Sequence, residues 1–209
     1  VITQKIVSKA EGAIVDLREI EPSPIAQEFA LKYGKDARLV ELVLRESARI
    51  VKMDRGVLIV ETKHGLVCAN AGIDASNIPG DHFVSLLPAD PDKSASELRT
   101  DLMAISGYPV AVIISDTFGR PWRMGSMDIA IGVAGIPALK DYRGNIDAHG
   151  YHLNASVAAT ADQIASAAEL ISGKLDAVPV VLVRGLIYSP DDKANARTLL
   201  RDPASDLFR

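Results

Sequence analysis

The sequence predicts an α+β fold, with mixed and antiparallel sheets and flanking helices. Strand-like apolar runs and helix-like apolar spacings both occur, but they do not alternate strictly as β-α-β units do. The chain has 209 residues, of which 48% are hydrophobic and 24% charged, so it can bury a substantial core. No internal repeat or low-complexity linker divides it. We therefore expect one domain over residues 1–209, with a two-lobed organisation left open.

The first half predicts strands on either side of a helical segment. The apolar start predicts a strand over 1–7. Apolar residues at helical spacing over 25–50 predict one or two helices, with a break near 33–36. Two further strands are predicted over 57–61 and 65–70, joined by a turn, and another over 83–87.

The second half predicts two clear helices. Residues 91–106 have an acidic, serine-rich start and a glycine stop, and 156–172 form an alanine-rich stretch that also ends at glycine. Apolar runs predict a buried strand over 110–114, a short segment over 129–133 and a strand over 179–183. A glycine- and aspartate-containing loop is expected over 135–150.

Composition argues against several classes of partner. A net charge of −4 gives no support for bulk electrostatic binding to nucleic acid or to an anionic membrane. No apolar run approaches the roughly 18 residues of a membrane span, and no signal-peptide pattern is present. The single cysteine, Cys68, lies in an apolar run and predicts a buried, inert thiol. We expect a cytoplasmic protein whose native N-terminus lies before Val1.

Familiar nucleotide and metal motifs are absent. Ser172-Gly173-Lys174 follows a predicted helix instead of preceding one, which is the wrong context for a P-loop. There is no GxGxxG and no HExxH. His149 and His152 are three residues apart, but they lie in a loop-like stretch, which favours solvated or capping roles over metal ligation.

Carboxylates near strand ends predict an oxygen-ligated metal site. Asp74 and Asp116 each follow an apolar strand, and Thr117 adds a hydroxyl. Mg²⁺ and Mn²⁺ prefer such oxygen ligands, often together with substrate phosphates. An Asx turn is an equally ordinary role for Asp74 in IDASN, so both interpretations stay open.

The stretch SDTFGRPWR predicts an anionic substrate. Arg120 and Arg123 offer rigid donor forks for phosphate or carboxylate, and Trp122 offers a flat surface for a ring. A surface loop pinned by a partly buried tryptophan is the alternative. Lys9 could pair with phosphate, although a lone lysine is commonly solvated. The residues alone support phosphoryl chemistry with no named substrate.

An ordered series of motifs resembles a known family. VITQKIVSKAEG, HGLVCANAGIDASN, LLPADPDKSA, SDTFGRPWR, AAELISGK and PVVLVRG occur in the order in which they stand in the gamma-glutamyl ligase of the deazaflavin coenzyme F-420. The resemblance runs from Val1 to about Gly185. It implies a GTP-dependent amide ligase without a P-loop. Such an enzyme joins L-glutamate to the lactyl carboxylate of the unglutamylated coenzyme through an acyl phosphate, and can extend the tail through gamma links.

The resemblance also implies cofactors, an assembly and residue roles. It implies Mg²⁺ or Mn²⁺ (two ions), a helpful K⁺, and an intertwined α+β homodimer. The implied metal ligands are Asp74, Asp116 and Thr117. Nucleotide contacts are implied for Gln4, Lys9, Asn77, Ser172, Gly173 and Lys174, within a nucleotide loop over 172–178. Substrate contacts are expected from Arg120, Trp122, Arg123 and Asp128, and catalytic roles from Asp74, Asp116, Arg123 and Lys9.

Departures from the family pattern leave alternatives open. Met124, Ser126 and Met127 stand in a core that usually carries amide and hydroxyl side chains, so a ligase for a different carboxylate is one alternative. Lys174 stands where some relatives carry a metal-binding Glu or Gln. Because a protonated lysine cannot ligate, a second metal would be weaker or held otherwise. A non-catalytic deazaflavin- or nucleotide-binding module, a fused nitroreductase-like domain, the choice of GTP or ATP, and the number of glutamates also remain open.

Overall fold

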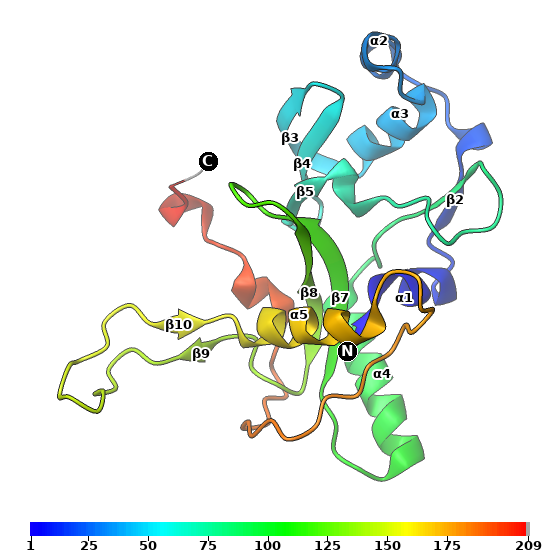
Figure 1. Ribbon diagram of the computed structural model, residues 1–209. Coiled ribbons are helices and arrows are strands. Elements are labelled where there is room, and N and C mark those ends of the chain that lie inside the picture. Colours follow the sequence, from blue (N-terminus) through cyan, green and yellow to red (C-terminus); the bar gives the residue numbers. More distant parts are fainter. Residues whose placement is uncertain (208–209) are drawn as a thin grey trace. The chain divides into compact units, whose positions relative to one another are not determined.

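The computed structural model describes residues 1–207, which form two compact units (Figure 1). Unit 1 combines Val1–Thr3, Asp90–Thr117 and the chain from Met127 onward, and unit 2 combines Gln4–Ala89 with Phe118–Ser126. Both units contain helices and small sheets, and the strand pairs include parallel and antiparallel ones. The α+β class is therefore confirmed, and the homodimer stays a prediction.

Unit 1 is built around the sheet β1-β7-β8. Its strands are β1 (Ile2–Thr3), β7 (Val112–Gly119) and β8 (Ser126–Ala134), and β1 runs parallel to β7. Helix α5 (Thr160–Ser172) packs on this sheet through small side chains such as Ala161 and Ala165, which lie in one buried cluster with Ile113 and Ala130 (Figure 1). Alanines four residues apart share one helix face, so they let the helix approach the strands closely.

The remaining elements of unit 1 flank this core. Helix α4 (Pro91–Ser106) precedes β7, and η3 (Ala196–Leu199) and η4 (Pro203–Ser205) follow late in the chain. Strands β9 (Lys140–Asp141) and β10 (Val157–Ala158) pair antiparallel at the base of a long hairpin arm (Figure 1).

Unit 2 contains two small antiparallel sheets and three helices. One sheet pairs β2 (Ile14–Asp16) with β6 (Phe83–Ser85), and the other has the order β3-β4-β5, from β3 (Ser47–Asp54), β4 (Val57–Thr62) and β5 (Val67–Ala69). The helices are α1 (Gln4–Ala10), α2 (Pro24–Tyr33) and α3 (Ala37–Arg45), with short turns η1 (Leu17–Glu19) and η2 (Asn70–Gly72).

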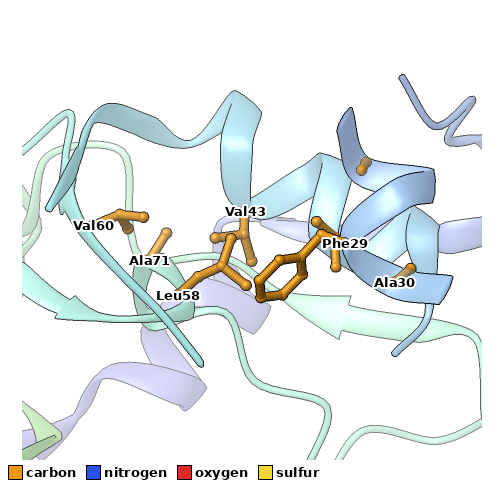
Figure 2. Close-up of a cluster of buried hydrophobic side chains, with 8 residues drawn as sticks. Phe29, Ala30, Val43, Leu58, Val60 and Ala71 are labelled. Carbon is orange, nitrogen blue, oxygen red and sulfur yellow. The ribbon is translucent and has the colours of Figure 1, made fainter. Parts of the chain in front are cut away.

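A buried cluster in unit 2 joins α2 and α3 to the β3-β4-β5 sheet. Figure 2 shows Phe29 from α2, Val43 from α3, and Leu58 and Val60 from β4 in this cluster. All four side chains are almost fully removed from solvent. This core holds the segment that leads from β5 into the D-x-x-N loop at 74–77, because Ala71 of η2 belongs to the same cluster.

Most predicted elements are confirmed. Helix α4 spans the predicted 91–106 and ends at Gly107, whose φ of 74° is left-handed. The helical segment breaks at Gly34, and Asp36 caps α3 by accepting the Arg38 N–H. Strands β4, β5 and β6 lie within or close to the predicted ranges, and Cys68 is buried as expected.

Several local predictions are wrong. The helix predicted over 156–172 begins only at Thr160, because Val157–Ala158 form strand β10, which pairs with strand β9 inside the loop predicted over 135–150. The strand predicted over 1–7 ends at Thr3, because only two of its residues pair with β7 and the buried side chains of Gln4, Val7 and Ser8 follow helical spacing. The strand predicted over 179–183 makes a single isolated bridge, from Val180 to Ile2. The segment 47–50 is part of strand β3 and not of a helix. The prediction failed because most of this strand is exposed and its apolar residues do not alternate.

A further correction concerns the polar residues after the buried strand. β7 continues to Gly119, so Asp116 and Thr117 lie within the strand and not in a loop beyond it. Alternate residues of a strand point to opposite faces, so these two neighbours lie on different faces of the sheet. No helix among the described residues is long and apolar enough to cross a bilayer.

Candidate functional site

In unit 2, the D-x-x-N loop is held by a lysine of α1. The Lys5 ammonium donates hydrogen bonds to the Asp74 carboxylate, to Ser76 Oγ at 2.6 Å and to the Ser76 carbonyl at 2.9 Å. Asp74 also accepts the Ser76 N–H at 2.7 Å and the Ser76 hydroxyl at 2.8 Å. Asp74 therefore forms the Asx turn that its sequence context allows, and its carboxylate has a fixed direction.

The surroundings of Asp74 keep its carboxyl ionised. Burial raises the pKa of Asp74, but hydrogen bonds from Lys5 and Ser76 outweigh burial and hold this pKa below its ordinary value of 3.8. The backbone is fixed as well, because Asp74 exchanges hydrogen bonds with Ser85 of β6 at 3.2 and 2.8 Å. An ionised, oriented and partly exposed carboxylate fits a hard cation such as Mg²⁺ or Mn²⁺.

The predicted nucleotide residues of unit 2 lie on α1 and the same loop. One turn after Lys5, the Lys9 ammonium donates to the Asn77 carbonyl at 2.6 Å. Asn77 has a left-handed φ of 56°, a conformation that asparagine tolerates better than most residues. Gln4 is buried, and its Nε2 donates to the Leu86 carbonyl at 3.2 Å. The structure thus brings Lys9 and Asn77 into contact and encloses Gln4 within the unit.

The arginines and the tryptophan lie in the connection between β7 and β8. Arg120 donates to the carbonyls of Met124 and Gly125, so its guanidinium holds the turn together. Trp122 has a φ of 58° and is 84% exposed. The alternative of a partly buried tryptophan is therefore wrong. Arg123 is also exposed, and the indole face and this guanidinium are accessible to a ligand.

In unit 1, a buried aspartate connects two strands. Asp128 of β8 accepts the hydroxyl of Ser115 at 3.0 Å and that of Thr117 at 2.6 Å, both from β7. Helix α5 fixes the backbone of Asp128, since Glu169 accepts its N–H at 2.8 Å and Ser166 donates to its carbonyl at 2.7 Å. Asp128 is only 8% exposed. Its evident role is to orient the Thr117 hydroxyl.

Lys174 completes this cluster from the end of α5. Helix α5 ends at Ser172, and Gly173 turns the chain with a φ of 57°. The Lys174 ammonium donates to Thr117 Oγ1, and lies 3.4 Å from a Glu169 oxygen and 3.9 Å from an Asp128 oxygen. The Thr117 hydroxyl thus donates to Asp128 and accepts from Lys174. A metal ion directly at Thr117 does not fit this arrangement, because an ammonium already contacts that oxygen.

The predicted site residues divide between the two units. Unit 1 holds Asp116, Thr117, Asp128 and the segment 172–174, whereas unit 2 holds Gln4, Lys9, Asp74, Asn77 and the connection 120–125. Within residues 1–207, no group of three His, Cys, Asp or Glu side chains forms a metal cluster. Of the two predicted carboxylate ligands, Asp74 lies in unit 2 and Asp116 lies in unit 1.

Lys5, Ser115 and Glu169 are among the contributing residues that were not predicted. Lys5 lies four residues before Lys9, and that helical spacing would have revealed it had 1–7 not been assigned to a strand. Ser115 ends an apolar run, and its inward direction depends on the strand continuing past it. Glu169 has no sequence signal, because a glutamate in a helix is ordinarily solvated.

Comparison of the sequence with known proteins identifies the family of this chain. The family model described as F420-0:Gamma-glutamyl ligase matches residues 1–185. A Methanopyrus kandleri protein named coenzyme F420:L-glutamate ligase is 47% identical over 100% of this chain and 84% of its own length. Proteins of the same name from Methanothermobacter thermautotrophicus and Methanocaldococcus jannaschii are 44% and 43% identical, over all of this chain and 83% of each relative. The chain belongs to the F420-0:gamma-glutamyl ligase family of enzymes.

Proposed function

We propose that this chain joins L-glutamate to the lactyl carboxylate of unglutamylated coenzyme F-420, and extends the product through gamma links, with GTP and a divalent metal ion. The observation that carries the proposal is the identity of 43–47%, over the whole chain, to proteins named coenzyme F420:L-glutamate ligase. The oriented carboxylate of Asp74, the exposed guanidinium of Arg123 and the ammonium of Lys174 support it.

The proposed reaction balances as two displacements. A carboxylate oxygen of the coenzyme forms a bond to the γ-phosphorus of GTP, and the bond to the GDP oxygen breaks. The glutamate nitrogen then forms a bond to the acyl carbon, inorganic phosphate leaves, and the amine proton passes to solvent. Bound Mg²⁺ or Mn²⁺ would supply neutralisation of the charge on the transferring phosphoryl group.

The chain's own groups are suited to binding and orientation. Asp74 is ionised and directed by Lys5 and Ser76, so it offers an oxygen to a metal ion without first losing a proton. Lys9 lies next to Asn77 and can pair with nucleotide phosphate. Arg123 is exposed on the connection between β7 and β8, where it can neutralise a carboxylate or phosphodiester of the coenzyme.

The proposal includes a homodimer in the cytoplasm. Large apolar side chains are unusually exposed in the segment that follows α5, including Leu175, Leu182 and Ile187. The β9–β10 arm likewise exposes Ile146 and Tyr151. Such accumulations commonly mark protein contacts, and a second copy of the chain is the proposed partner. Light scattering coupled to gel filtration tests this, with Ile187→Glu expected to shift the mass from dimer to monomer.

The direct test is product analysis. The protein would be incubated with unglutamylated coenzyme, L-glutamate, Mn²⁺ and either GTP or ATP, and products followed by mass spectrometry. We expect a product heavier by one glutamyl unit with GTP, lost in Asp116→Asn and retained in Asp101→Asn, a matched change at an exposed position of α4.

The other outcomes separate the alternatives. GTP consumption only with other carboxylates would indicate a ligase with a different substrate, consistent with Met124 and Met127. Binding of nucleotide or deazaflavin without any turnover would indicate a binding module. Either result would overturn the proposed function.

A further inference from the structure

The cluster around Thr117 is rich in negative charge and holds one cation. Asp128 and Glu169 contribute two carboxylates, both largely buried. The Thr117 hydroxyl donates to Asp128, and Glu169 accepts the Asp128 N–H and lies 3.4 Å from the Lys174 ammonium. Within residues 1–207, Lys174 is the one side chain whose cationic nitrogen lies within 4.0 Å of either carboxylate. Its ammonium is therefore the local counter-ion of this cluster.

Lys174 is held at this position by the backbone. It lies two residues after the end of α5, where the unpaired carbonyls of a helix C-terminus favour a cation. Gly173 provides the turn with a left-handed φ of 57°, and a Cβ there would lie 2.1 Å from a carboxylate oxygen of Asp176. The turn that delivers the ammonium thus depends on glycine. The lysine is covalently tethered, so its local concentration does not depend on dissolved ions.

We propose that the Lys174 ammonium is the built-in cation of the Thr117–Asp128–Glu169 cluster and takes the place of a metal ion there. An ammonium has three donors and no lone pair, so it satisfies hydroxyl and carboxylate oxygens as a cation does but cannot itself ligate a metal. It also repels a second cation from the same oxygens. The chain consequently binds one divalent ion fewer than a variant with a carboxylate at position 174.

The catalytic role of this cation rests on the proposed function. The number of metal ions that the chain binds can, however, be measured without turnover. In the proposed ligase, Lys174 would hold the Thr117 hydroxyl in one orientation and would permanently offset one of the cluster's two negative charges. Asp74, whose carboxylate is ionised and oriented in unit 2, would then offer its oxygens to a dissolved metal ion.

The experiment is a count of Mn²⁺ ions bound by the full chain. Electron paramagnetic resonance of free Mn²⁺, supported by calorimetry, would compare the wild type with Lys174→Glu and Lys174→Gln. Lys193→Gln, at an exposed position of the same unit, is the matched control, and Lys174→Arg retains the positive charge. Circular dichroism verifies that each variant is folded.

We expect the wild type, Lys193→Gln and Lys174→Arg to bind the same number of Mn²⁺ ions. Lys174→Glu should bind one additional Mn²⁺ ion. Its dissociation constant should be at least about tenfold lower than that of any additional Mn²⁺ ion that the wild type binds weakly. Lys174→Gln should gain the same ion more weakly. Equal Mn²⁺ counts in the wild type and in folded Lys174→Glu would overturn the inference.

These results separate the two proposals. A gain of Mn²⁺ in Lys174→Glu by a chain that makes no glutamyl product would support the built-in cation and overturn the ligase function. A glutamyl product together with unchanged Mn²⁺ counts would support the ligase function and overturn the built-in cation.

Discussion

Replacing Asp128 with asparagine tests how the Thr117 hydroxyl is held. In the structure both carboxylate oxygens of Asp128 accept hydroxyls, from Ser115 at 3.0 Å and from Thr117 at 2.6 Å. Asparagine is nearly the same size, but it offers one uncharged acceptor oxygen and presents an amino group to the other hydroxyl. The substitution therefore changes hydrogen bonding and charge while it leaves packing almost unaltered.

The expected loss of stability follows from these two bonds. A hydrogen bond to a charged group contributes about 1.5–3 kcal/mol, and one between neutral groups about 1 kcal/mol. Losing one bond and weakening the other together cost about 2–5 kcal/mol. For a chain of this size, each kcal/mol lowers Tm by about 2–4 °C, so we expect a decrease of about 4–20 °C. The partly exposed ion pair with Lys174 adds little, because water screens it.

Scanning calorimetry measures this effect, with Asp101→Asn as the exposed control. Glutamyl transfer should also fall in Asp128→Asn, even at temperatures where the variant is fully folded, because the Thr117 hydroxyl loses its fixed direction. A Tm within about 1 °C of the wild type, with unchanged activity, would refute the role assigned to Asp128.

Two other substitutions give independent tests. Lys5→Met removes the main group that lowers the pKa of Asp74. Because this pKa is lower in the folded chain than its ordinary value of 3.8, ionised Asp74 stabilises the fold above pH 3.8. That stabilisation is lost as the pH falls through the lowered pKa. The variant should therefore be less stable than the wild type in urea near about pH 6, with the difference closing towards about pH 2; a constant difference would contradict this. Gly132→Ala places a Cβ 2.2 Å from the Pro91 carbonyl oxygen, whereas Gly119→Ala meets nothing within 4 Å. The first should lower stability by about 1–3 kcal/mol or more, and the second should not. Soluble yield and Tm measure this, and equal behaviour of the two variants would count against the close packing of α4 on β8.

The predicted fold was accurate where local signals were strong. Helix α4 has a capping aspartate, an N-terminal proline and a glycine stop, so its bounds followed from the sequence alone. Strand β3 was missed because most of its side chains are exposed, which removes the alternation that identifies a half-buried strand. Strand β1 was overextended because Ile6 and Val7 appear strand-like, although they lie in a helix that buries Gln4 and Ser8.

The sequence supplied candidate site residues, which stay predictions, but it did not supply the hydrogen-bond partners that hold them. Resemblance to the family pointed to Asp74 and Thr117, and the structure supplies their partners, Lys5 and Asp128. Such partners depend on contacts between residues distant in sequence, and Lys174 reaches Thr117 across a separation of 57 positions. Only the packing of α5 on β7 and β8 makes that contact possible.

The most direct test of the central claim is the ratio of glutamyl product to inorganic phosphate. Unglutamylated coenzyme, L-glutamate, GTP and Mn²⁺ would be supplied, with product quantified by mass spectrometry and phosphate by a colorimetric assay. The proposed acyl-phosphate reaction predicts one phosphate released for each glutamyl unit added, and neither in Asp116→Asn. Glutamyl product without phosphate, or phosphate without product, would contradict the proposal that GTP drives amide formation in this protein.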